Sequence, residues 1–241
     1  LQECDSKSVI SGALLGESLG LSPSPQLGQY YLVPFKQKEK RDRNGNFLEP
    51  ECTKATFIIG YKGMLQLAMR SGYYKKIVVL ELKKGELTGF DPLEETIECN
   101  LIEDPDEREA APTVGYYAMF EYQNGFRKAI YWTQNKMMRH ADHYSKAFSA
   151  KEYERLLRGE IPEKELWKYS SFWYTSFDDM AKKTMLRQLL SHWGMLSTDM
   201  QEAFEADGES ITNDGNNLVP EIDAGDTEPI APAEQPNDLP A

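Results

Sequence analysis

The stretch ATFIIGYKGMLQLAMRSG, at residues 55–72, predicts a strand, a tight turn and a helix in direct succession. Its first part is rich in β-branched and aromatic residues, which favour a strand. Gly60 and Gly63 form a Gly-x-x-Gly turn, and glycines allow one backbone to approach another closely. Beyond the turn the apolar residues recur with helical spacing. The first amide groups of such a helix lack intrahelical partners and favour anions.

Two residues inside this turn, Tyr61 and Lys62, bring an aromatic ring and an ammonium group to the start of the helix. Such a turn suits the phosphate–sugar chain of a nucleic acid, with the ring available to a base or a sugar. A purely structural explanation stands beside this one, because a strand–helix connection can need small residues for packing alone. The local sequence leaves both interpretations open.

The remaining sequence predicts an α+β fold with a small, mostly antiparallel sheet of three to five strands, long hairpins and helices packed on one side. A strand at 31–35 is expected to pair with one at 55–60 through a long basic hairpin marked by Asn44-Gly45. Asn124-Gly125 marks a second hairpin. Further strands are expected at 75–82, 94–101, 113–122 and 126–132, and helices at about 5–20, 62–71, 134–148, 150–158, 165–191 and 198–206.

The charge of the chain is distributed unevenly along its length. The net charge is −12, from 27 Lys and Arg and 39 Asp and Glu. No Lys or Arg follows Arg187, whereas 12 of the acidic residues lie from Asp199 onward, so the rest of the chain holds 27 acidic residues against 27 basic ones. A neutral body can still carry a basic stripe. We expect a folded core at 1–198 and an acidic, mostly disordered tail at 199–241.

Several classes of protein are disfavoured because their motifs are missing from the sequence. Cys4, Cys52 and Cys99 form no Cys-x-x-Cys pair, so neither a zinc ribbon nor a disulfide framework is predicted, and a reducing cytosol fits. No apolar run is long enough to span a bilayer. The sequence lacks a Gly-x-x-x-x-Gly-Lys-Ser/Thr loop, which argues against an ATP-driven strand-exchange motor. His140 and His143 have no further ligands at metal-binding spacing.

A metal-dependent nuclease is the best enzymatic candidate, on the basis of Glu81 and Lys83. Glu-x-Lys on a strand resembles half of a nuclease motif of the Asp…Glu-x-Lys type. The upstream Asp is missing, because no acidic residue lies between Glu51 and Glu81. We therefore expect a binding protein without a covalent catalytic step.

Cations gather in four places along the chain, and aromatic residues lie between them. Cations neutralise phosphates, and rings stack on bases at roughly 1–3 kcal/mol per base, so this pattern suits sequence-tolerant binding of single strands. The alternatives are a solvated face for each basic cluster and core packing for the rings. The clusters are Lys36, Lys38, Lys40, Arg41 and Arg43; Lys62, Arg70, Lys75 and Lys76; Lys136, Arg139, His140, His143 and Lys146; and Lys182, Lys183 and Arg187. The rings are those of Tyr61, Trp132, Tyr144, Trp173 and Tyr174.

Three motifs, in the same order, resemble the RecT family of phage-type single-strand DNA annealing proteins, which are recombinases. They are LSPSPQLGQYYLVPF at 21–35, the stretch at 55–72 and DDMAKKTMLRQLL at 178–190. They lie within residues 10–195, and agreement at all three makes the resemblance specific.

The resemblance implies that the core binds single-stranded DNA and anneals complementary strands without ATP, in phage-type homologous recombination. It implies a homo-oligomer, either a ring or a helical filament, in the cytoplasm of a bacterial host and away from membranes. Its ligands would be single-stranded DNA and the annealed duplex. No cofactor would be required, and Mg²⁺ would be a modulator at most. A 5′→3′ exonuclease and a single-strand-binding protein would be partners through the tail.

The expected DNA-binding residues come from the motifs and from helical periodicity. The motifs supply the turn and the cations of the last long helix, whereas periodicity alone supplies the cations at 134–148. The set is Gly60, Tyr61, Lys62, Gly63, Arg70, Lys136, Arg139, Lys146, Trp173, Lys182, Lys183 and Arg187.

Two other functions share these sequence features. A passive single-stranded DNA coating protein would need the same cations and rings, so only the family resemblance favours annealing. A structural phage assembly protein could use basic faces to meet acidic subunits, and it would show no salt-dependent binding of DNA.

Overall fold

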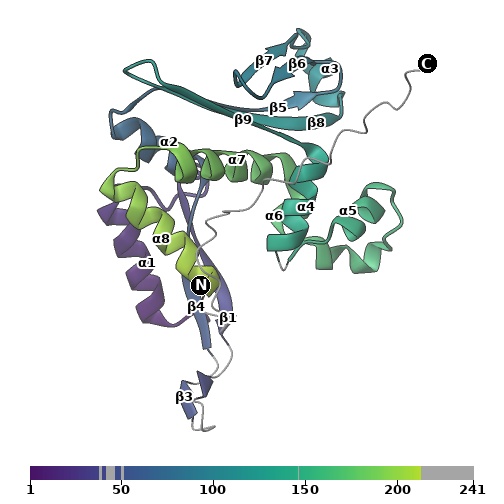
Figure 1. The fold of residues 1–241 in the computed structure, drawn as a ribbon. Coiled ribbons are helices and arrows are strands. Elements are labelled where there is room, and N and C mark those ends of the chain that lie inside the picture. Colours follow the sequence, from purple (N-terminus) through teal and green to yellow (C-terminus); the bar gives the residue numbers. More distant parts are fainter. Residues whose placement is uncertain (38–39, 42–46, 50–51, 146, 213–241) are drawn as a thin grey trace, which may run out of the picture.

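The computed structural model describes residues 1–37, 40–41, 47–49, 52–145 and 147–212. It confirms an α+β protein with small antiparallel sheets (Figure 1). The strands do not all join one sheet, because the long hairpin and the central sheet are separate and share one hydrophobic core.

The long hairpin is built from β1 (Tyr30–Gln37) and β4 (Cys52–Ile59). They pair antiparallel from Tyr30 opposite Ile59 to Gln37 opposite Cys52, as the sequence predicts. The short strands β2 (Lys40–Arg41) and β3 (Phe47–Glu49) continue the hairpin. The expected Asn44-Gly45 turn, with Lys38 and Arg43, lies outside the described residues.

Helix α1 (Ser6–Ser18) packs on this hairpin through glycines. Asp5 caps the helix, since its carboxylate accepts the Ser8 N–H at 3.1 Å. Gly12 and Gly16 are the buried residues of α1, and a Cβ on them would come within 2.5 Å of Leu32 and 2.3 Å of Tyr30. The aliphatic residues Ile10 and Leu14 lie on the exposed side instead.

The central sheet has the order β5–β8–β9, with β5 at Tyr74–Lys83, β8 at Thr113–Tyr122 and β9 at Arg127–Thr133. Helices α4 (Gln134–Tyr144) and α7 (Phe177–Trp193) cover one face. The other face is covered by the hairpin of β6 (Leu87–Asp91) and β7 (Thr96–Cys99), with α3 (Pro105–Ala110) nearby (Figure 1). Both faces of β8 are therefore buried.

Helix α5 (Ala150–Leu157) matches the helix expected at 150–158. The single helix expected at 165–191 is instead divided into the 3₁₀ helix η1 (Glu163–Tyr169), α6 (Phe172–Thr175) and α7. The helical path is broken at residues 170–171 and again at Ser176, which has φ −148° and ψ 57°. We call residues 150–175 the arm, because in Figure 1 they project from the body beside α4.

Helix α8 (Thr198–Thr212) packs against β4 and against α2 (Tyr61–Arg70). Its Met200 and Ala203 are fully buried. Residues 199–207 of the predicted tail therefore belong to the packed structure, and residues from 213 onward lie outside the described part. Within the described residues, no helix combines the length and apolar character needed to cross a membrane.

Candidate nucleic-acid interface

The Gly-x-x-Gly turn packs against the chain's own backbone. Gly60 donates its N–H to the carbonyl oxygen of Gln29 at 2.7 Å. A Cβ on Gly60 would lie 2.1 Å from the Gly28 oxygen, and a Cβ on Gly63 would lie 2.1 Å from the Gln29 oxygen. Both glycines are buried, so close backbone approach is their role in this fold. Of the four turn residues, Tyr61 and Lys62 are the ones left with surface exposure.

Lys62 is exposed at the start of α2 and has no ion pair within the described part of the chain. Tyr61 beside it is half-buried, and burial raises the pKa of its phenol while Lys182 lowers it. The aromatic ring is thus held at the junction of α2 and α7, with one edge accessible. Together these two side chains offer a cation and a ring at a helix N-terminus.

Lys182 is largely neutralised by carboxylates from two elements. Its ammonium lies 3.4 Å from Glu81 on β5 and 3.1 Å from Asp179 on α7. Burial alone would lower the pKa of Lys182, but the hydrogen bond from Asp179 and the charge of Glu81 raise it. This pairing stabilises the contact of α7 with the sheet and leaves little net positive charge for a phosphate.

Lys183 has the opposite environment, because no described carboxylate lies within ion-pair distance of it. Burial, together with the positive charge of Arg187 one helical turn later, lowers the pKa of Lys183 to about 7. A cation in this position is destabilised until an anion joins it. A phosphate would supply that anion.

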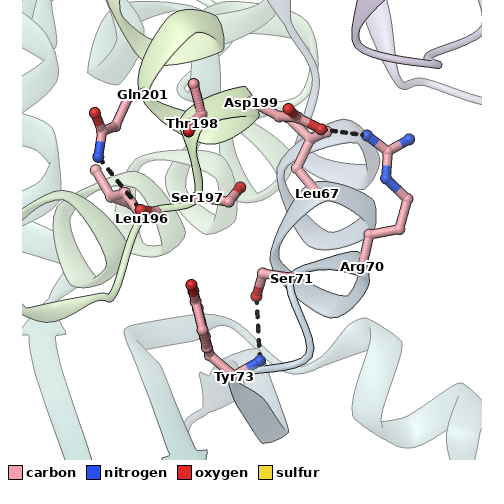
Figure 2. A pocket seen from close by; sticks show the side chains of 9 residues that line it. All are labelled: Leu67, Arg70, Ser71, Tyr73, Leu196, Ser197, Thr198, Asp199 and Gln201. Carbon is pink, nitrogen blue, oxygen red and sulfur yellow. Dashed lines mark hydrogen bonds and ion pairs between the residues drawn. The ribbon is translucent and has the colours of Figure 1, made fainter.

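Arg187 and Arg70 are both held by aspartates of α8. Arg187 pairs with Asp207, and its guanidinium lies 5.5 Å from the ring centre of Phe204. Arg70 donates to Asp199 at 2.9 Å and to the carbonyl oxygen of Leu19 at 2.8 Å. Figure 2 shows the Arg70–Asp199 pair at the rim of a pocket of about 360 Å³ between α2 and the start of α8.

Helix α4 presents a second group of cations and rings. The ammonium of Lys136 lies 4.5 Å from the ring centre of Trp132, and His140 packs on the same indole at 5.2 Å. Arg139 is exposed on this helix. Trp132 pairs with Tyr116 across β8 and β9, and Tyr116 donates its hydroxyl to Asp178 at the start of α7. Helix α4 and the N-terminal end of α7 therefore pack on the same strand, β8.

The comparison with known proteins agrees with the family resemblance of the three motifs and extends it over nearly the whole chain. The model of the RecT family matches residues 1–220. The chain belongs to the RecT family.

Two curated relatives are similar to most of the chain. Protein YqaK of Bacillus subtilis, described as uncharacterized, is 35% identical over 222 residues, which are 90% of this chain and 63% of the relative. Protein RecT of Escherichia coli is 28% identical over 207 residues, which are 86% of this chain and 65% of the relative. The chain spans less than two thirds of the length of each of these relatives.

The RecT-family motifs meet in space. The segment 21–35 supplies the backbone under the Gly-x-x-Gly turn, and the segment 178–190 supplies Lys182 beside Tyr61. Lys136 and Arg139 lie on the neighbouring α4, whereas Arg70 lies at the other end of α2. Lys146 lies outside the described residues.

Trp173 is placed differently from the other expected residues. It is buried among aromatic rings, 5.8 Å from Phe148 and 5.3 Å from Phe177 between ring centres. Among the described residues, the two most exposed rings of this RecT-family protein are instead on the arm, where Trp167 is 72% and Phe172 is 65% exposed. Sequence reasoning missed them, because a tryptophan in an amphipathic segment carries no mark of which side faces solvent.

The Glu81-x-Lys83 pair belongs to a structural network. Lys83 donates to Thr113 at 3.0 Å and lies 3.9 Å from Asp178, while Arg108 lies 3.6 Å from Glu81. These contacts join the N-terminus of α7 and the helix α3 to the sheet. Within the described residues, no group of three or more His, Cys, Asp or Glu side chains could hold a metal ion.

Proposed function

We propose that the protein binds single-stranded DNA and anneals complementary strands without ATP, in phage-type homologous recombination. The observation that carries this proposal is the convergence of the three RecT-family motifs around the N-terminus of α2. Lys62 is exposed at this place, and the half-buried Lys183 lies on α7, next to Lys182 in the chain. Both would gain from a phosphate, and neither has a carboxylate partner within the described residues.

In this mechanism the protein binds the phosphates and leaves the reading of sequence to base pairing. Lys62 and Lys183, with Arg139 and Lys136 on α4, bind the backbone of the first strand and keep its bases available. A complementary strand adds stacking energy that a mismatched strand forfeits, so pairing converts a weak complex into a tight one. No covalent step is needed. The proposal requires no cofactor. Mg²⁺ would at most modulate annealing by screening the phosphate charges of the two strands.

The test is to mix the protein with one labelled strand, add its complement without nucleotide, and follow pairing against a protein-free control. Faster pairing, together with a complex that resists a salt challenge only when the strands are paired, supports annealing. Binding of the first strand with slowed pairing would make the protein a passive coating protein. Absence of salt-dependent binding to DNA would favour the structural assembly role.

We also propose that the protein acts as a homo-oligomer, in a ring or a filament. Two apolar surfaces support this, one on the outer side of α1 with Ile10 and Leu14, the other on the arm with Leu157, Trp167 and Phe172. They lie on opposite sides of the molecule (Figure 1). A contact between the arm of one copy and α1 of the next is head-to-tail, and such contacts give rings or open helical filaments.

The region after α8 is the proposed attachment point for a 5′→3′ exonuclease or a host single-strand-binding protein. It is acidic and lacks Lys and Arg, so a partner would meet it with a basic surface. Deleting residues 213–241 tests this, because the deletion leaves the described structure complete. Retained binding of both candidate partners by the shortened chain would refute it.

A further inference from the structure

Helix α8 places two aspartates beside the helices that carry the expected DNA-binding cations. Its described acidic side chains are those of Asp199, Glu202, Glu205 and Asp207, and it contains no Lys or Arg. Two of them, Asp199 and Asp207, point at arginines of α2 and α7, whereas Glu202 and Glu205 are exposed and form no ion pair within the described residues. The helix therefore makes specific contacts with two cations of the expected DNA-binding set.

The contact at Asp207 is an anchor. Asp207 is buried, pairs with Arg187 and accepts the backbone N–H of Ile59 at 3.3 Å. Phe204 lies on the same guanidinium, and Met200 and Ala203 are fully buried beneath the helix. Separating a buried carboxylate from both its arginine and its backbone N–H would leave it without partners away from water, which is costly. The C-terminal part of α8 around Asp207 is therefore held in place.

The contact at Asp199 is of another kind. The Arg70 and Asp199 side chains are 41% and 52% exposed, although their atoms are only 2.9 Å apart. An exposed ion pair is weak because water and salt screen it. The second hydrogen bond of Arg70, to the Leu19 carbonyl oxygen, holds the guanidinium in position whether or not Asp199 is bound. Arg70 is thus a pre-positioned cation whose carboxylate can leave.

We propose that Asp199 occupies a phosphate-binding position at Arg70, and that the DNA backbone displaces it. A carboxylate and a phosphate accept the same guanidinium hydrogen bonds, so they compete for one cation. Anchoring by Asp207 keeps Asp199 close to Arg70 and makes the competition intramolecular. The pocket beside the pair, lined by Ser71, Ser197 and Thr198, gives the incoming phosphate room next to the guanidinium (Figure 2). This inference rests on the proposed binding of single-stranded DNA.

The experiment compares two substitutions of equal charge on the full chain, Asp199→Asn and Glu202→Gln. Binding of a labelled oligothymidylate is measured by fluorescence anisotropy at several salt concentrations. In the wild type, a phosphate at Arg70 replaces a carboxylate that already neutralises the cation, so this contact adds little to the salt dependence. In Asp199→Asn the same contact counts in full, which steepens the salt dependence by about 0.7 and corresponds to about fivefold tighter binding at 0.1 M salt. We expect this change for Asp199→Asn, and a change within about twofold with an unaltered slope for Glu202→Gln, because exposed charges are screened.

A third variant identifies the cation. In an Arg70→Gln background, Asp199→Asn should no longer tighten binding, since the displaced contact is gone. Equal behaviour of Asp199→Asn and Glu202→Gln, or an Asp199→Asn effect that survives Arg70→Gln, would overturn the inference and leave the proposed function standing. Absence of binding by the wild type and all variants would overturn both. Unchanged thermal unfolding of Asp199→Asn shows that the comparison concerns binding alone.

Discussion

The carbonyl oxygen of Gln29 fills the space that a side chain at Gly63 would need, since a Cβ there would lie 2.1 Å from it. Gln29 belongs to the motif at 21–35 and Gly63 to the motif at 55–72, so this contact joins two of the three motifs that resemble the RecT family. The motifs are therefore parts of one packed unit. Tyr61 and Lys62 lie between Gly60 and Gly63, so the packing of these two glycines on residues 28–29 fixes their position.

Replacing Gly63 with alanine should destabilise the protein strongly. The added methyl group meets a backbone oxygen, which cannot rotate away as a side chain can. The free energy of unfolding should therefore fall by at least the roughly 1–3 kcal/mol that overpacking usually costs. Urea unfolding measures the loss. Gly89→Ala is the matched control, because its Cβ would lie 3.4 Å from the flexible Glu98 side chain. Equal free energies of unfolding for the two variants would contradict the packing role.

Much of the fold could be predicted because local signals and tertiary packing agree. The strand at 113–122 coincides with β8, and the pairing of the strands at 31–35 and 55–60 follows from the Asn44-Gly45 hairpin signal between them. The helix expected at 165–191 was too long at its N-terminal end. Apolar residues continue through 165–176 with helical spacing, but the serines at 170, 171 and 176 end one helix and begin the next.

The candidate site could be predicted only in part, because a sequence shows charges and not their partners. Lys182 and Lys183 are neighbours with the same side chain, yet one lies between two carboxylates and the other has none within the described residues. One of the two carboxylates near Lys182 is Glu81 on β5, which lies about 100 residues earlier in the chain, so the sequence around Lys182 does not reveal the contact. Trp173 and Trp167 likewise differ in burial although both lie in one amphipathic segment.

Lys183 should make stability depend on pH. Its pKa is lowered to about 7 in the folded protein, against about 10.4 for an ordinary lysine, so between these values the unfolded chain holds one proton more. The free energy of unfolding contributed by this group therefore rises as pH rises above 7, and the full penalty is present below 7. A shift of one pKa unit corresponds to about 1.4 kcal/mol, so we expect a gain on the order of 1–2 kcal/mol between pH 7 and 9.

Lys183→Met isolates this contribution, since methionine has a similar length and no charge. Urea unfolding of both proteins at pH 7 and pH 9 gives the difference, in which the titration of all other groups cancels. The variant should be the more stable protein at pH 7, and its advantage should shrink at pH 9. A difference that stays constant with pH would show that the ammonium is not buried in the folded state.

Lys62→Ala should weaken binding of single-stranded DNA of every sequence to a similar degree. If Lys62 contacts one phosphate, the variant should lose about 0.7 from the slope of log affinity against log salt. Lys84→Ala removes an equal charge from an exposed residue in the turn between β5 and β6, far along the chain from α2 and α7. Its slope should match the wild type. The same loss in both variants would indicate a general effect of net charge rather than a contact.

Leu14→Ser should reduce self-association without unfolding the protein. Leu14 is 63% exposed, because α1 packs on the hairpin through Gly12 and Gly16, so serine removes little from the core. If the arm of a neighbouring copy covers Leu14, the variant loses apolar area at that contact, at about 25 cal/mol per Å². Sedimentation velocity, with and without DNA, should then show smaller assemblies.

Trp167→Ser should act in the same way from the other side of the contact. Leu93→Ser is the control, since Leu93 is 90% exposed but belongs to neither apolar surface. Assemblies of wild-type size in both Leu14→Ser and Trp167→Ser would exclude this pairing of surfaces, and loss of size in only one of them would point to contact between two identical surfaces instead.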